Sequence, residues 1–492
     1  MELMNIFRAS AIAAALVLAG CGGDINISEG AIDNSVTDNS VINNTSGDDG
    51  TDETPVVTDN RPGDASSFLS SQVSTALGKT VDVRSISGRL VAADADASGN
   101  ITLTNDTVWA LEGAVFVGND NADSINLVIE PGTIVFGRSG SDYIVVSRGS
   151  DIEAIGTAAE PIIMTSYNDV LGDEVRAGQW GGVIILGNAP STKCPQDGTD
   201  CSLQVEGVES GAVFGGTDST DDSGTLNYVV VKYAGFEIAP DNELNGITFG
   251  GVGSGTTVDY VQVHANADDG VEFFGGSVSA KHLVLTSIQD DSVDWDNGFK
   301  GNMQFVLVKH ADDNSDANRG IEGDGDGGDG AAVSNPTVAN MTIIGNTFDT
   351  AESDSEGVLL RDQTNAQLYN FVVTGPAGMG ECFEADLSDG DTTLEANMDG
   401  TNNPQLVFAS SVLACGENIK NSGDFDQEAW FTTQSDTSTA AGQSAVLNGV
   451  YTIDTTAPTD VTTLGTFFSS VDFIGAVKDA ENDWTDNWKG GV

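Results

Sequence analysis

Acidic side chains recur at a regular spacing in the middle of the chain. Three apolar segments, Val258–His264, Lys281–Leu285 and Met303–Lys309, are each followed by a polar, acidic turn. The carboxylates of these turns are Asp268, Asp269, Glu272, Asp290, Asp291, Asp294 and Glu322. Carboxylates held close together raise one another's pKa or recruit a cation, and calcium prefers oxygen ligands. The turns therefore predict a calcium site; the alternative is that these groups face solvent and cap turns.

A second group of oxygen ligands follows the third apolar segment. Asp312, Asn314 and Asp316 occupy alternate positions, as the ligands of a calcium loop do. An EF-hand is excluded, because Ala317 stands where that loop needs glycine and no glutamate occupies the twelfth position. A looser calcium site remains an open alternative here. The acidic, glycine-rich run at 324–330 is calcium-like in composition too, with a flexible turn as the alternative.

The same region holds residues that could perform catalysis on a polysaccharide. Asp290 and Asp291 are adjacent carboxylates, and clustered carboxylates serve as acid and base in glycoside hydrolases. A lyase needs a basic proton acceptor, for which Lys309 is a candidate. The other candidate bases are Lys300, Arg319 and Arg361. A strongly acidic groove would repel an acidic polysaccharide unless calcium bridged the two.

The spacing of the apolar segments predicts how the acidic turns are positioned. Steps of 22 and 23 residues separate Val261, Leu283 and Val306. This period is too short for a propeller blade and fits one coil of a β-solenoid. A single coil cannot bury its own inward face, whereas stacked coils close a continuous core. We therefore expect an all-β solenoid.

Stacking would bring the acidic turns into register. Residues at equal positions on successive coils form files with a spacing of about 4.8 Å. Glu272, Asp294 and Glu322 are expected in one file. The neighbouring files would pair Asp268 with Asp290 and Asp269 with Asp291. Aromatic residues near the turns are expected to stack as ladders inside the coils, with sugar stacking as the alternative. They are Tyr233, Phe236, Tyr260, Phe273, Phe274, Trp295 and Phe299.

Several phrases in the chain resemble those of a known family. They are I-E-P-G-T-I at 129–134, G-T-A-x-x-P-I-I-M-T-S ending at Ser166, G-Q-W-G-G-V-I-I-L-G-N-A-P at 178–190 and D-D-G-V-E-F-F-G-G at 268–276. Their order resembles that of exported and lipid-anchored bacterial proteins with a right-handed parallel β-helix of pectin-lyase-like shape. The resemblance implies a fold and no particular activity. The His-Gly and Arg-x-Lys signatures of related pectin hydrolases are missing.

The expected organisation is all-β, with a single right-handed parallel β-helix at 101–420. An N-terminal cap region is expected at 65–100, with a short helix at 65–77. A C-terminal cap is expected at 421–492, with a short helix at 421–431 and with Trp484 and Trp488 packing against the last coils.

The N-terminal residues indicate export. Arg8 precedes a largely apolar run, Ala9–Leu18, that is too short to span a bilayer. The following L-A-G-C phrase resembles the lipobox of bacterial lipoproteins. The resemblance implies a signal peptide at 1–20, a lipid anchor on Cys21 and an outer-membrane or cell-surface location, because Gly22 is not the aspartate of an inner-membrane retention signal. The polar, acidic segment at 21–64 is expected to be a disordered tether.

Four further cysteines lie in the exported part of the chain: Cys194, Cys201, Cys382 and Cys415. An even number in an exported protein predicts disulfides, and four cysteines leave three pairings open. Cys194 with Cys201 would close a polar loop, and Cys382 with Cys415 would tie down the C-terminal part. Zinc binding is the alternative, but neither pair has the spacing of zinc ligands.

The charge balance limits the class of partner. The chain has 75 acidic and 18 basic residues, for a formal charge of -57. Nucleic acid is excluded as a partner, because phosphates would be repelled. We expect a non-catalytic binding or scaffold protein, calcium-stabilised and anchored in the membrane, that serves an outer-membrane receptor or uptake system. The alternative is a polysaccharide lyase or glycoside hydrolase that acts in a groove along the coils.

Overall fold

The computed structural model describes residues 69–74, 80–195, 200–208, 210–240, 242–313, 315–325, 333–350, 354–388, 390–486 and 488. The chain divides into two units, 1–59 and 60–492, and all described residues belong to the second. The expected signal peptide, Cys21 and the tether at 21–64 lie outside the described residues. Among the described helices, none has the length and apolar character needed to cross a membrane.

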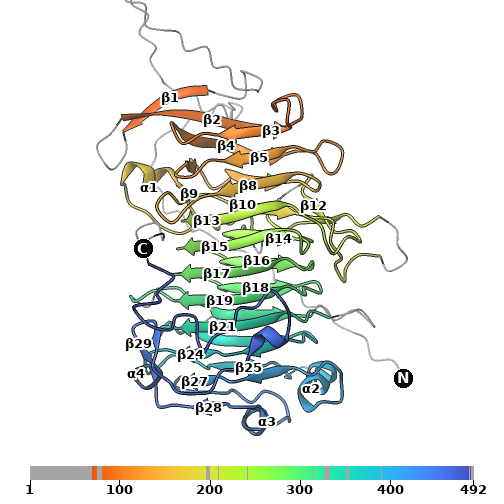
Figure 1. Cartoon of the computed structure of the whole chain (residues 1–492), viewed down its shortest axis with the longest axis vertical. Helices are drawn as coiled ribbons and strands as arrows, with labels where there is room; N and C mark the ends of the chain where they lie inside the picture. Colours follow the sequence, from red (N-terminus) through yellow and green to blue (C-terminus); the bar gives the residue numbers. More distant parts are fainter. Residues whose placement is uncertain are drawn as a thin grey trace, which may run out of the picture. The chain divides into compact units, whose positions relative to one another are not determined.

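The described unit is a parallel β-helix whose coils pass through three parallel ladders of strands (Figure 1). The first ladder contains β3 (Asn100–Leu103), β5 (Asn126–Ile129), β8 (Asp151–Ile155), β23 (Gln367–Tyr369) and β26 (Val407–Ala409). The second ladder contains β2 (Thr80–Leu90), β4 (Val108–Val117), β6 (Ile134–Gly137), β9 (Ile162–Ser166), β24 (Val372–Thr374), β27 (Val412–Ala414) and β28 (Ser438–Thr439). The third contains β7 (Tyr143–Val146), β10 (Gly182–Leu186), β14 (Ile247–Gly250), β16 (Val271–Phe274), β18 (Val293–Asp296), β20 (Arg319–Asp324), β22 (Glu356–Arg361) and β25 (Phe383–Ala385).

Longer, bent strands belong to two ladders at once. The strands that continue from the first ladder into the second are β13 (Gly224–Lys232), β15 (Thr257–His264), β17 (Ser279–Thr286), β19 (Asn302–Lys309) and β21 (Thr337–Ile344). Val261 pairs with Leu283, and Leu283 pairs with Val306. The predicted solenoid period is therefore confirmed, because each step of 22 or 23 residues is one full coil.

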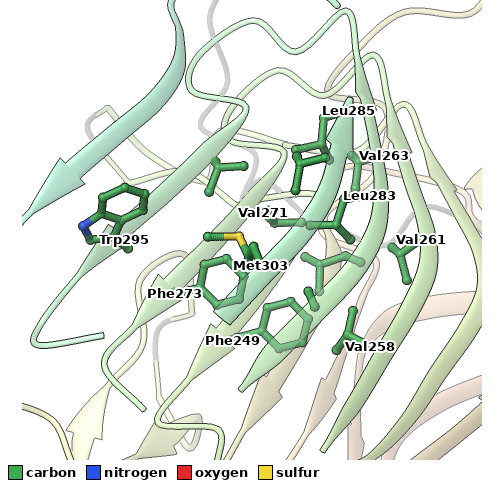
Figure 2. Close-up of a cluster of buried hydrophobic side chains, with 14 of the residues drawn as sticks. Phe249, Val258, Val261, Val263, Val271, Phe273, Leu283, Leu285, Trp295 and Met303 are labelled. Carbon is green, nitrogen blue, oxygen red and sulfur yellow. The ribbon is translucent and has the colours of Figure 1, made fainter. Parts of the chain in front are cut away.

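The core fills the space between the ladders. Strand side chains alternate between the inside and the outside, so Val271 and Phe273 of β16 are buried among apolar residues while Glu272 faces outward. Phe249, Phe273 and Phe299 form a stacked ladder inside the coils, with ring centroids 5.2 and 4.4 Å apart. Figure 2 shows Phe249 and Phe273. The predicted interior ladder is confirmed for Phe273 and Phe299.

A second aromatic ladder lies on the outside and corrects the prediction for Tyr260. Tyr228, Tyr260, His282 and Phe305 stack with centroids 4.4, 4.2 and 5.0 Å apart. Each of them has a positive φ at the bend between the first and second ladders, a conformation that costs about 1 kcal/mol or more per residue. This bend turns their side chains outward, where Trp484 and Trp488 pack against them. The two tryptophans therefore pack as predicted, but the expected place is wrong, because they lie against β13, β15 and β17 in the middle of the stack and not against the last coils.

The remaining elements cap or cover the coils. The other strands are β1 (Leu69–Ser74), β11 (Leu203–Gln204), β12 (Val213–Phe214), β29 (Leu447–Asn448) and β30 (Tyr451–Thr452). The helices are α1 (Tyr167–Leu171), α2 (Thr392–Asp399), α3 (Gln427–Thr433), α4 (Gln443–Val446) and the 3-10 turn η1 (Val461–Thr463). The helix predicted at 65–77 is wrong for its described part, since β1 pairs antiparallel with β2. The helix predicted at 421–431 begins later, as α3, because Asp426 caps it by accepting from the backbone N–H of Ala429.

The two disulfides lie in different surroundings, one in an insertion and the other against the main apolar core. Cys194 is bonded to Cys201, and Cys382 to Cys415. The first bond lies in the insertion between β10 and β13, which also contains β11 and β12. This insertion packs Val205, Val208 and Phe214 onto the outward apolar side chains of β7 and β10. The outer face of the third ladder is therefore partly covered.

Candidate functional site

The predicted file of carboxylates exists on the outer face of the third ladder. Glu272 of β16 pairs with Asp294 of β18, which pairs with Glu322 of β20. We define the acidic strip as the carboxylates on and beside this file: Asp268, Asp269, Glu272, Asp290, Asp291, Asp294, Glu322, Asp324, Glu356, Glu381 and Glu384. The stacking of short, regular coils is what brings residues from distant parts of the chain into this strip.

The upper part of the strip comprises Asp268, Asp269, Glu272, Asp290 and Asp294. One carboxylate oxygen from each of Asp269, Glu272 and Asp294 lies within 4.8 Å of the others, and the same holds for Asp268, Asp269 and Asp290. None of the five forms a salt bridge with any residue that the structure describes. The upper part is therefore a concentration of negative charge without a protein counter-ion.

Burial distinguishes these groups from ordinary surface carboxylates. Asp269 and Glu272 are only 7% and 6% exposed. Asp269 accepts a hydrogen bond from the backbone N–H of Asp291 at 3.0 Å, and Glu272 accepts one from the side-chain amide of Asn245. Asp294 is partly exposed as a residue, yet its Oδ1 is fully enclosed and has no hydrogen-bond partner in the part of the chain that the structure describes. An enclosed carboxylate oxygen without a donor is costly, so Asp294 Oδ1 indicates a place for a cation.

The electrostatics follow from this burial and crowding. Burial, together with Asp290 and Glu243, raises the pKa of Asp268 to about 8. Burial and the neighbouring carboxylates also raise the pKa values of Asp269, Glu272 and Asp294 well above their usual range. In the absence of a metal, these groups would therefore retain protons that exposed carboxylates lose.

The lower part of the strip carries its own cations. Arg319 lies 2.9 Å from Glu322 and 3.6 Å from both Asp291 and Glu356. The remaining pairs are Arg361 with Glu322 at 3.1 Å and with Asp324 at 2.8 Å, and Lys420 with Glu381 at 2.6 Å and with Glu384 at 2.9 Å. Burial raises the pKa of Glu322, while Arg319 and Arg361 act against that rise. The lower part is thus a network of ion pairs.

Some lower-strip residues were missed by the sequence-based prediction. Glu356, Glu381, Glu384 and Lys420 lie beyond the region of regular coil spacing. Asp354, Glu356 and Glu381 form a third group of carboxylates close enough to share a metal ion. Lys420 already lies within salt-bridge distance of Glu381, however, so this group has a protein cation in place.

The structure separates the candidate catalytic residues. Asp291 is buried and accepts a hydrogen bond from the backbone N–H of Arg319. Asp290 accepts a hydrogen bond from the side-chain amide of Asn318 at 2.6 Å. Lys309, at the end of a strand in the second ladder, forms an ion pair with the exposed Asp312. Lys309 is therefore not brought together with the candidate carboxylates, whereas Arg319, another candidate base, is the ion-pair partner of Asp291 at 3.6 Å.

The predicted calcium loop is not assembled among the residues that the structure describes. Asp312 and Asp316 are exposed and belong to none of the described groups of three potential ligands. Asn314 lies outside the described residues, as do residues 326–330 of the glycine-rich run. Asp324, at the start of that run, belongs instead to the lower strip through Arg361.

Comparison with known proteins agrees with this architecture. A family model described as a pectate-lyase-like beta helix domain matches residues 95–459. No significant match is found with a curated protein or with a solved structure. The matched range includes the whole acidic strip and every strand of the three ladders except β2.

Proposed function

The chain belongs to the pectate-lyase-like β-helix family, and from this premise we propose that it is a cell-surface binding protein whose upper acidic strip holds calcium. The ion would neutralise the upper strip and offer its remaining coordination positions to oxygen atoms of a ligand. The observation that carries the proposal is the enclosed Asp294 Oδ1, which has no hydrogen-bond donor and faces other carboxylates.

The donor set fits calcium. Calcium takes six to eight oxygen ligands in flexible geometry, and Asp269, Glu272 and Asp294 supply closely spaced carboxylate oxygens. Asp268 and Asp290 add a second set that shares Asp269. No histidine or cysteine belongs to these groups, which disfavours zinc. When bound, calcium would supply positive charge that the protein does not provide at this place.

A binding role is better supported than catalysis. Asp291 accepts a hydrogen bond from Arg319 and is paired with its side chain. Lys309 forms its ion pair with Asp312, outside the acidic strip. The surface location is proposed from the sequence alone, because Cys21 and the export signal lie outside the described residues. Replacing Cys21→Ser should release the protein from membranes in a fractionation experiment. Capture of a ligand for an outer-membrane receptor would suit an anchored protein with a long tether.

Calcium titration of the metal-free protein tests the proposal. Calcium at millimolar concentration should raise the melting temperature, and calorimetry should detect binding. The Asp294→Asn variant should lose both effects. Asp316→Asn is the matched control, because it removes an exposed acidic charge outside the strip. Absence of a calcium effect on the wild-type protein, or an equal loss in the control, would contradict the proposal.

A further inference from the structure

A recess of about 340 Å³ opens beside the upper strip. Its lining residues are Lys193, Leu203, Gln204, Val205, Glu206, Phe214, Phe274, Asp296 and Asn297. Asp296 lies two residues after Asp294 on the outward face of β18, and Glu206 is close enough to raise the pKa values of Asp268 and Glu272. The recess and the proposed calcium site are therefore neighbours. The disulfide between Cys194 and Cys201 restrains the insertion that forms its wall.

An aromatic platform forms one side of the recess. Phe274 lies two residues after Glu272 on the outward face of β16 and is partly exposed. The ring of the buried Phe214 stacks beside it, with centroids 6.0 Å apart and planes 27° apart. Leu203 and Val205 complete an apolar surface. A flat, partly exposed ring on a rigid support suits the apolar face of a sugar ring.

The polar side of the recess accepts hydrogen bonds. Asn297 is only 7% exposed, and its Oδ1 is enclosed, with no hydrogen-bond partner among the described residues. Glu206 and Asp296 add carboxylates, which accept hydrogen bonds when ionised. A ligand that donates hydrogen bonds through hydroxyl groups would satisfy the Asn297 Oδ1 and would also donate to these carboxylates. A ligand carboxylate would instead meet two side chains of its own charge sign, with Lys193 as the cation among the lining residues.

We propose that this recess binds a neutral pyranose unit of a glycan, with one ring face on Phe274 and its hydroxyl groups donating to Asn297 and the adjacent carboxylates. The proposal rests on the proposed binding function of the strip and specifies its ligand class. Neighbouring hydroxyl oxygens of the same glycan would reach the calcium. The volume suits a single ring, since ligand pockets for small molecules begin at about 300 Å³.

Glycan binding by the calcium-saturated full chain tests the proposal. The probes are an array of neutral and uronic-acid glycans, followed by calorimetry with the best neutral oligosaccharide and with oligogalacturonate. We expect a neutral glycan to bind most tightly and Phe274→Leu to weaken that binding at least tenfold. Asn297→Gly, which suits the positive φ at this position, should weaken it several-fold. Phe467→Leu is the control, because Phe467 is also partly exposed but lies against Lys281 in the C-terminal segment.

The outcomes separate this proposal from the calcium proposal. Tightest binding of a uronic-acid glycan, no binding of any neutral glycan, or wild-type affinity in both Phe274→Leu and Asn297→Gly would overturn the recess proposal. Its variants should keep the calcium-induced rise in melting temperature, which shows that they remain folded. If the wild-type protein shows no calcium effect but binds a neutral glycan through Phe274, the recess proposal stands and the calcium proposal fails.

Discussion

The two parts of the acidic strip differ in how the repulsion between their carboxylates is offset. Both place carboxylates on successive coils of one ladder, at a spacing that makes them repel. The lower part inserts Arg319, Arg361 and Lys420 between its carboxylates. In the upper part, none of the described basic residues forms a salt bridge with the carboxylates. A repeated fold therefore allows one part of a surface to pair its carboxylates with protein cations. The carboxylates of the next part can then bind an external cation.

The largest expected effect comes from removing a cation of the lower part. Arg319→Met leaves Asp291, Glu322 and Glu356 with like charges and one partner fewer. Breaking a buried ion network in this way costs about 3 kcal/mol of unfolding free energy. Denaturant unfolding of the metal-free protein measures the loss. A variant as stable as wild type would show that the lower part does not depend on its own cations.

Removing a charge from the upper part should raise the unfolding free energy of the metal-free protein, whereas removing a cation from the lower part lowers it. At alkaline pH, where the metal-free upper part loses the protons that it otherwise retains, Asp294→Asn relieves repulsion, so the metal-free protein should gain about 1 kcal/mol of unfolding free energy, while the calcium response disappears. Denaturant unfolding with and without chelator measures both. A loss of stability in the metal-free variant would mean that Asp294 is already neutralised in the wild-type protein.

The pH dependence of stability should reveal the upper part when calcium is removed. The pKa of Asp268 is raised in the folded protein to about 8 from the usual 3.8. The folded state therefore holds a proton that the unfolded chain has lost, and its stabilising contribution is complete below pH 3.8 and disappears as pH rises through about 8. Melting temperatures in chelator should fall from about pH 5 to about pH 8.

Calcium should reduce this fall in melting temperature, because it replaces the protons. In Asp268→Asn the slope in chelator should be smaller than in wild type. A melting temperature that rises with pH in chelator would contradict the assignment of the upper part as self-repelling.

The smallest effect is expected in the exposed loop. Asp312 is 83% exposed at the side chain and pairs only with Lys309 among the described residues. Exposed pairs contribute little to stability. Asp312→Asn should therefore leave both the melting temperature and calcium binding unchanged within error. A reduced calcium affinity in this variant would indicate that the loop contributes to a calcium site.

The regular middle of the fold could be predicted because its period is constant. Steps of 22 and 23 residues between Val261, Leu283 and Val306 predict that Glu272 and Asp294 share one file, whereas Glu322 follows a longer turn and is assigned to the file from the similar sequence of its turn. The period lengthens beyond this region, so the contribution of Lys420 could not be read from spacing.

The burial of the acidic side chains could not be predicted from the sequence pattern either. The insertion that covers the third ladder comes from a distant part of the chain, and only its packing reveals that Glu272 is enclosed. Aromatic residues posed a similar difficulty, because Phe273 and Tyr260 are similar in type and lie on opposite sides of the coil wall. The positive φ at Tyr260, which decides its direction, leaves no clear mark in composition.

The C-terminal segment that carries Trp484 and Trp488 has a practical consequence. It returns from the last coils to the level of β15 and β17 in the middle of the stack (Figure 1). There the two tryptophans pack against Tyr228, Tyr260 and His282. A fluorophore or spin label placed near residue 488 would therefore report on the central coils. It would not detect unfolding that is confined to the end of the stack. Truncating the chain before Trp484 would expose the aromatic side chains of Tyr228, Tyr260 and His282. This exposed aromatic surface should promote self-association.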